Sequence, residues 1–260
     1  MHPALWISKT GLSAQDARLA TISNNLANAS TVGFKKDRAV FEDLLYQVKR
    51  EPGGQSSQDT QLPSGLQIGT GVRTVSTQKV FDTGNMEITD RGLDVAINGR
   101  GFFQVQLPDG NVGFTRNGQF HTDSTGQLVT ANGYALIPSI TIPEGSQGVT
   151  IGEDGTVVVR DGSGQQSQIG SMELVDFINP SGMLAKGQNL FLESTASGSP
   201  QAGTPGLNGV GRLLQNTLEG SNVNVVEELV NMIATQRTYE MNSKVVSTAD
   251  QMLQQAAQIL

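Results

Sequence analysis

The sequence predicts an α+β protein in which a long helix at each end of the chain flanks a central all-β domain. Of the 31 glycines, all but Gly11 and Gly33 lie between Gly53 and Gly220, and residues 221–260 contain neither glycine nor proline. Glycine and proline cost about 1 and 3 kcal/mol in a helix interior, so the helices belong at the ends and the turns in the middle. Apolar residues also recur every seven positions near both ends, which is typical of long coiled-coil helices.

The N-terminal helix is expected to run from Pro3 to near Gly33. Proline is favoured at a first helical position because the N–H that it lacks would have no partner there. The expected seam of this helix, at which it packs on other subunits, is a stripe of leucines: Leu5, Leu12, Leu19 and Leu26.

Three asparagines lie inside the same predicted helix, at Asn24, Asn25 and Asn28. Asparagine is a poor helix former because its side chain competes for backbone hydrogen bonds. The cluster is either a solvent-facing group or a polar face whose hydrogen bonds are satisfied only when other helices pack around it.

The C-terminal helix is expected to begin after Asn224, a favourable N-cap residue, and Glu227 three residues later completes a capping-box-like pair. A helix that lies on its own domain usually shows a wider apolar face, about three positions in seven. The narrow stripe here instead favours pairing of the helices with each other and with copies in other subunits. The stripe consists of Val225, Met232, Tyr239, Val246, Leu253 and Leu260.

Between the helices the sequence indicates β-structure. Phe103, Val105 and Leu107 alternate with polar residues before the turn residues 108–110. Short strands with frequent turns predict a β-sandwich or barrel-like domain. The expected divisions are an N-terminal helix (1–33), an extended linker (34–71), a β-rich domain (72–220) and a C-terminal helix (221–260). Further hairpin turns are expected at Asn132-Gly133, Asp154-Gly155 and Asp161-Gly162.

Composition excludes several classes of site. There is no cysteine, which removes disulfides and thiol chemistry, and two histidines (His2 and His121) cannot form a multi-histidine metal centre. The net charge of −7 argues against a nucleic-acid partner. No stretch approaches the ~20 apolar residues of a membrane span, and no secretory signal is recognisable. We therefore expect no cofactor, no metal, no catalytic residue and no membrane insertion, and we expect the charges at 35–38 to lie in a solvated loop.

The residues near both ends resemble a known family. The run Ile22-Ser23-Asn24-Asn25-Leu26-Ala27-Asn28 through Gly33-Phe34-Lys35 is similar to the N-terminal motif of bacterial flagellar rod and hook proteins. The C-terminal motif of that family resembles residues 225–233 and 236–242, and its central motifs resemble residues 93–99, 101–103 and 115–118. The resemblance covers nearly the whole chain.

Within the family, residues 46–71 resemble the members that build the distal rod rather than the hook. The resemblance implies a non-enzymatic subunit of a hollow helical homopolymer that transmits motor torque across the periplasm. Its implied partners are further copies of itself, proximal rod and hook proteins, the peptidoglycan-layer and outer-membrane ring proteins, and the flagellar type III export apparatus. Within residues 46–71, those expected to keep the rod straight are Tyr46, Val48, Pro52, Leu62, Pro63, Leu66 and Ile68.

Three alternatives remain open at this point. A hook or proximal rod subunit of the same family would share both terminal motifs. A cell-wall hydrolase or transglycosylase would need a placed acid, and the central block offers no convincing carboxylate pair. A secreted β-rich adhesin would bind its ligand outside the cell.

Overall fold

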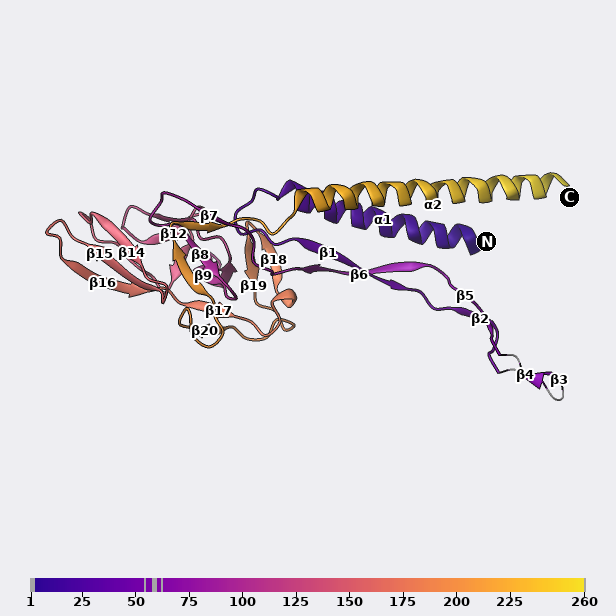
Figure 1. Cartoon of the computed structure of the whole chain (residues 1–260), viewed down its shortest axis with the longest axis horizontal. Coiled ribbons are helices and arrows are strands. Elements are labelled where there is room, and N and C mark those ends of the chain that lie inside the picture. Colours follow the sequence, from indigo (N-terminus) through magenta and orange to yellow (C-terminus); the bar gives the residue numbers. More distant parts are fainter. Residues whose placement is uncertain (1–2, 54, 58–59, 62, 260) are drawn as a thin grey trace. The chain divides into compact units, whose positions relative to one another are not determined.

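The computed structural model describes residues 3–53, 55–57, 60–61 and 63–259. The chain divides into two compact units (Figure 1). The first comprises Met1–Ala27, Asp37–Gln78 and Asn224–Leu260, and the second comprises Asn28–Lys36 and Lys79–Val223. We call the second unit the β-domain.

The first unit contains helices α1 (Pro3–Ala27) and α2 (Val225–Ile259), which lie side by side (Figure 1). The predicted cap of α2 is confirmed, because Asn224 Oδ1 accepts hydrogen bonds from the backbone N–H groups of Val226 (3.1 Å) and Glu227 (3.4 Å). No described helix carries an apolar stretch long enough to cross a bilayer. Helices therefore occupy both ends of the chain, as the sequence predicts.

Helix α1 ends six residues earlier than expected, at Ala27 rather than near Gly33. The chain turns there, with the Thr31 N–H donating to Asn28 O at 3.1 Å. Gly33 has a different role from helix termination. Its φ is +70°, and a Cβ at this position would lie only 2.8 Å from the backbone nitrogen of Asn117. Glycine is thus required here by a close backbone approach inside the β-domain.

Residues 34–71, expected as a linker, fold largely as β-structure. We call the pair β1 and β6 the ribbon, and the pair β2 and β5, with β3 and β4 at its tip, the hairpin. Long-range pairing of β1 with residues beyond the segment supplies the order that its own composition does not indicate. The strands are β1 (Asp37–Asp43), β2 (Gln47–Arg50), β3 (Gln55–Ser57), β4 (Thr60–Gln61), β5 (Leu66–Ile68) and β6 (Val72–Lys79).

The β-domain contains a seven-stranded sheet in which the neighbouring strands pair antiparallel. In spatial order its strands are β11 (Phe120–Thr122), β12 (Leu128–Thr130), β13 (Ala135–Ile137), β9 (Phe103–Gln106), β10 (Val112–Thr115), β19 (Leu190–Leu192) and β18 (Leu184–Gly187).

Smaller sheets complete the β-domain. One has three strands, β14 (Gly148–Ile151), β15 (Thr156–Arg160) and β16 (Gln166–Ser171). The others are the pairs β17 (Leu174–Asp176) with β20 (Gln201–Gly203), β8 (Val95–Asn98) with β21 (Arg212–Gln215), and β7 (Met86–Ile88) with β22 (Thr217–Glu219); a short 3₁₀ helix spans Pro180–Gly182.

The predicted hairpin turns are confirmed. The Gly110 N–H donates to Leu107 O at 3.0 Å between β9 and β10. The other predicted turns join β12 to β13, β14 to β15, and β15 to β16. Because each turn residue type has its own backbone preference, these turns could be predicted from a few adjacent residues.

Three apolar clusters are buried in the β-domain. Because successive strand residues point to opposite faces, the neighbours Phe102 and Phe103 belong to different clusters. Phe103 packs edge-on against Phe120, with ring centroids 5.1 Å apart. Phe102 packs with Phe81, Phe177 and Phe191. The second cluster places an aromatic wall beside a group of buried charges.

Candidate assembly surfaces and a buried charge cluster

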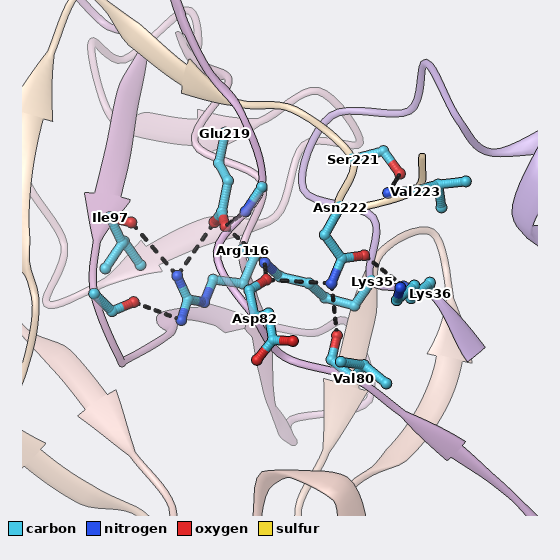
Figure 2. Close-up of polar contacts among 12 residues, drawn as sticks. Lys35, Lys36, Val80, Asp82, Ile97, Arg116, Glu219, Ser221, Asn222 and Val223 are labelled. Carbon is cyan, nitrogen blue, oxygen red and sulfur yellow. Dashed lines mark hydrogen bonds and ion pairs between the residues drawn. The ribbon is translucent and has the colours of Figure 1, made fainter. Parts of the chain in front are cut away.

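A buried carboxylate, Glu219, lies at the end of β22 with two buried cations (Figure 2). Its Oε1 accepts from Lys35 Nζ at 2.6 Å and from the Gly84 backbone N–H at 2.9 Å. Its Oε2 accepts from Arg116 Nη1 at 3.2 Å. Both carboxylate oxygens are therefore hydrogen-bonded, which is the condition under which a buried charge is tolerated.

Other donors of the two cations bind backbone carbonyls. Lys35 Nζ also donates to Asp82 O at 2.6 Å, and Arg116 Nη2 donates to Gly99 O at 2.8 Å. The Arg116 guanidinium lies 5.3 Å from the centre of the Phe102 ring. Its Nε is buried and has no hydrogen-bond partner among the described residues.

Three stretches of chain meet at this cluster: residues 33–36, 80–84 and 219–222. The Gly33 N–H donates to Glu219 O at 2.7 Å, and the Lys36 N–H donates to Asn222 Oδ1 at 2.8 Å. Asn222 Nδ2 in turn donates to Val80 O at 2.8 Å (Figure 2). The segment that follows α1 in the chain and the segment that precedes α2 are thus fastened to each other within the β-domain.

Lys35 and Arg116 are two buried cations that both form an ion pair with Glu219, while Asp82 and Asp176 act on Lys35 and Arg116 more weakly. Burial lowers the pKa of Lys35, and the nearby Glu219 carboxylate opposes this shift. Burial also lowers the pKa of Arg116, again opposed by Glu219. Glu219 is consequently the carboxylate that most strongly offsets the desolvation of both cations.

The expectation of a solvated loop at residues 35–38 is wrong for Lys35, which is only 1% exposed. The prediction failed because its ionic partner is 184 positions away in the chain. Arg116 and Glu219 were not singled out as functional residues either. One local signal for the burial of Lys35 is the aromatic residue directly before it in the sequence, Phe34, which is also buried.

The buried residues on the described part of α1 are Ser8, Ala14, Ile22 and Asn25, and none of the predicted leucines is among them. On α2 the buried positions recur every seven residues at Glu228, Thr235 and Ala249. Asn242 continues this series and faces Gly11 of α1, where an added Cβ would lie 3.1 Å from Asn242 Nδ2. The two helices therefore approach closely at Gly11 and Asn242.

The predicted stripe residues are only partly covered in the single chain. Leu5, Leu12, Leu19 and Leu26 are half-buried on α1, as are Met232 and Val246 on α2. Val225, Tyr239 and Leu253 are exposed, and Leu260 lies outside the described residues.

Helix α2 also exposes apolar side chains beyond the predicted stripe. Val226 is 70% and Val230 61% exposed, and Ile233, Met241 and Met252 are exposed as well. Exposed apolar side chains repeated along a long helix indicate an interaction surface. The candidate assembly surface is therefore wider than the sequence stripe indicated.

The three asparagines considered as a polar packing face lie in different environments. Asn25 is buried and pairs with the backbone of Asp37 in the same chain. Asn24 is exposed, whereas Asn28 is half-buried and its backbone carbonyl closes the turn after α1. A role in contacts between subunits stays a prediction for Asn24 and Asn28.

The hairpin exposes several of the residues singled out in the sequence. Tyr46, Val48 and Leu66 each have about half of their surface exposed, and Ile68 is half-buried. Leu45, which was not singled out, is 91% exposed. Among the remaining members of the predicted set, Pro52 and Pro63 are exposed and Leu62 lies outside the described residues.

Asp154, from a predicted hairpin turn, and His121 take part in local contacts within the β-domain. Asp154 Oδ1 accepts from the Thr156 N–H at 3.2 Å and from Thr156 Oγ1 at 2.7 Å, which holds the turn between β14 and β15. The His121 Nδ1 lies 3.1 Å from Arg91 Nη2. Over the described residues, no group of three or more His, Cys, Asp or Glu side chains could hold a metal ion.

Three family models match the chain. The model described as flagella basal body rod protein matches residues 5–35, the flagellar hook protein FlgE/F/G D1 domain matches 96–159, and the flagellar basal body rod FlgEFG protein C-terminal model matches 214–259. Lys35, Arg116 and Glu219 fall one in each matched region.

Similar proteins are known over the full length of the chain. The flagellar basal-body rod protein FlgG of Buchnera aphidicola from Schizaphis graminum is 59% identical over 260 residues, covering all of both chains. FlgG of Borreliella burgdorferi is 46% identical over 97% of both chains, and FlgG of Bacillus subtilis is 37% identical over 98% of both.

The shared carboxylate predicts an order of destabilisation. Glu219→Gln leaves two buried cations without their shared ion-pair partner and is expected to cost about 3–5 kcal/mol of unfolding free energy. Lys35→Met leaves the Arg116–Glu219 pair neutral and is expected to cost less, about 1–3 kcal/mol. Lys186→Gln, which removes an exposed pair with Asp109, serves as the control at about 1 kcal/mol or less.

Urea denaturation followed by circular dichroism measures these differences. Equal losses for Glu219→Gln and Lys35→Met would show that the shared carboxylate is not what balances the cluster.

Proposed function

Because the chain belongs to the flagellar basal-body rod protein family, we propose that it is a structural subunit of the distal rod. Many copies would polymerise into a straight, hollow helical shaft that carries motor torque to the hook. The role is mechanical and not enzymatic. The observation that carries the proposal is the apolar surface left uncovered along α2 in the single chain.

The helices supply the inner tube of this shaft. The described residues of their apolar stripes are half-buried or exposed in the single chain, so both stripes have surface left for neighbouring copies. A seven-residue repeat keeps one stripe directed at a partner along the whole helix. The proposal is therefore that coiled-coil packing between subunits, rather than within one subunit, holds the tube together.

The β-domain forms the outer part of the shaft, and the charge cluster around Glu219 supports its mechanical coupling to the helices. The chain leaves the β-domain toward α1 and α2 through residues 28–36 and 219–224, which the cluster fastens together. Torque applied to either helix reaches the β-domain through these fastened connections.

The hairpin keeps the shaft straight. Its exposed apolar residues, including Leu45, Tyr46, Val48 and Leu66, have no core of their own and suit docking on an adjacent subunit. A contact of this kind pins neighbouring copies at one spacing, whereas a bendable tube requires subunits that slide.

The assembled shaft would stand in the basal body between proximal rod proteins and the hook, and turn inside the peptidoglycan-layer and outer-membrane rings. The subunit would reach that position through the flagellar type III export channel. The hook and proximal rod subunits are the nearest alternatives, and the rod name carried by full-length relatives favours the rod.

Electron microscopy of concentrated protein tests assembly directly, and Leu253→Asp is the informative variant. Leu253 is exposed in the single chain, so the variant should fold normally, but in the tube it would bury an unpaired charge at a cost of several kcal/mol per subunit. No tubes are expected. Gln251→Asp, also exposed and on another face of α2, should still assemble. Leu253→Asp tubes of normal length would place this residue outside the subunit contact.

Removing the hairpin separates assembly from straightness. Deletion of residues 46–63 should leave polymerisation intact, because the helices are unchanged, but the tubes should be curved or flexible. A milder double variant, Val48→Ser with Leu66→Ser, keeps the hairpin and removes two exposed apolar contacts, and should bend the tubes less. Curvature in electron micrographs measures both. Straight, equally stiff tubes from the deletion would contradict a straightening role.

A further inference from the structure

The ribbon is fixed at one end to the C-terminal part of α1. The Asn25 side chain forms two hydrogen bonds with the backbone of Asp37, the first residue of β1. Asn25 Nδ2 donates to Asp37 O at 2.9 Å, and Asn25 Oδ1 accepts from the Asp37 N–H at 2.8 Å. Since Asn25 is 2% exposed, this paired contact is protected from competition by water.

The other end of the ribbon is fixed to the N-terminal part of α1. Thr10 Oγ1 accepts from the N–H of Val72, the first residue of β6, at 3.3 Å, and donates to Ile7 O at 2.8 Å. Gly71 has a φ of +122°, and a Cβ there would overlap Thr10 Oγ1. Gly71 O accepts from the Leu44 N–H at 2.9 Å, which places both strands of the ribbon at this contact.

The two contacts match in spacing. Thr10 and Asn25 are fifteen residues apart, about 22 Å along a helix at 1.5 Å per residue. Asp37 and Leu44 are seven residues apart, about 23 Å along a strand at 3.3 Å per residue. An extended strand and a helix segment of equal length are therefore joined at both ends, and β1 packs on α1 between them (Figure 1).

We propose that Thr10 and Asn25 are positioning residues that hold the ribbon along α1 and so fix the direction in which the hairpin projects toward a second copy of this chain. The inference rests on the proposed straightening role of the hairpin and adds the residues that set it. A hairpin on an isolated two-stranded ribbon would swing, because such ribbons are marginally stable in water. Two contacts remove that freedom where one would leave a hinge.

The test replaces Thr10 in the full-length chain. Thr10→Val keeps the shape of the side chain and removes the hydroxyl that accepts from Val72. Thr10→Ser keeps the hydroxyl. Thr21→Val is the matched control, since Thr21 Oγ1 donates to Ala17 O at 2.9 Å within the same helix. Tubes of each variant are compared for curvature by electron microscopy and for exchange of the Val72 amide hydrogen.

The expected result is curved or flexible Thr10→Val tubes with about fivefold faster exchange at Val72, the change that loss of one ordinary hydrogen bond gives. Thr10→Ser and Thr21→Val tubes should be as straight as those of the unmodified chain. If Thr10→Val alone does not assemble, mixtures with the unmodified chain should bend increasingly as its fraction rises.

Straight tubes from Thr10→Val, or straight mixtures at every fraction that assembles, would overturn the positioning role. This failure is distinguishable from failure of the proposed function. If deletion of residues 46–63 bends the tubes while Thr10→Val does not, the hairpin straightens the rod but Thr10 does not position it. If the unmodified chain forms no tubes, the proposed function itself is contradicted.

Discussion

The burial of Glu219 is the constraint on which the organisation of the chain depends. Taking a carboxylate and two cations out of water costs several kcal/mol per ion, and only well-placed partners offset that cost. Lys35, Arg116 and the Gly84 N–H supply these partners from three separate stretches of chain. Because a half-satisfied cluster is worse than none, the segments after α1 and before α2 have one favourable arrangement, and this suits a part that has to carry load between them.

The helices follow the opposite principle. The buried residues on the described part of α2 are Glu228, Thr235 and Ala249, and Gly11 of α1 lies against Asn242. Few large apolar side chains are thus buried on the helices, and their burial contributes correspondingly little stability. Their larger apolar side chains remain available for neighbours. A subunit of this design gains most of its helical stability on assembly, whereas its β-domain already has three buried apolar clusters. The β-domain, in the middle of the sequence, is thus ordered by its own core, whereas the helices at the two ends depend on neighbouring copies.

The sequence predicted those features whose causes are local. The N-cap at Asn224 and the hairpin turns depend on a few adjacent residues with strong backbone preferences, and all were confirmed. The Lys35–Glu219 pair, the ribbon and the end of α1 depend on residues far apart in the chain. No periodicity within residues 34–71 shows that β1 will pair with β6, and an isolated lysine beside other charges ordinarily lies in solvent. The buried positions Glu228, Thr235 and Ala249 of α2 and the approach of Asn242 to Gly11 were missed because such residues do not form an apolar stripe.

The ribbon links the hairpin to helix α1. Its sequence is too polar to build a core, so its order comes from what it touches, and the bonds from Thr10 and Asn25 tie it to α1. A helix is stiff along its axis because each residue is bonded to the next turn, and a strand fastened to it at both ends shares that stiffness. Contact with α1 would therefore hold the hairpin rigid, and packing on neighbouring copies would in turn hold α1 rigid. Straightness in such a shaft is then a property of the assembled helices, transmitted outward through two hydrogen-bonded contacts.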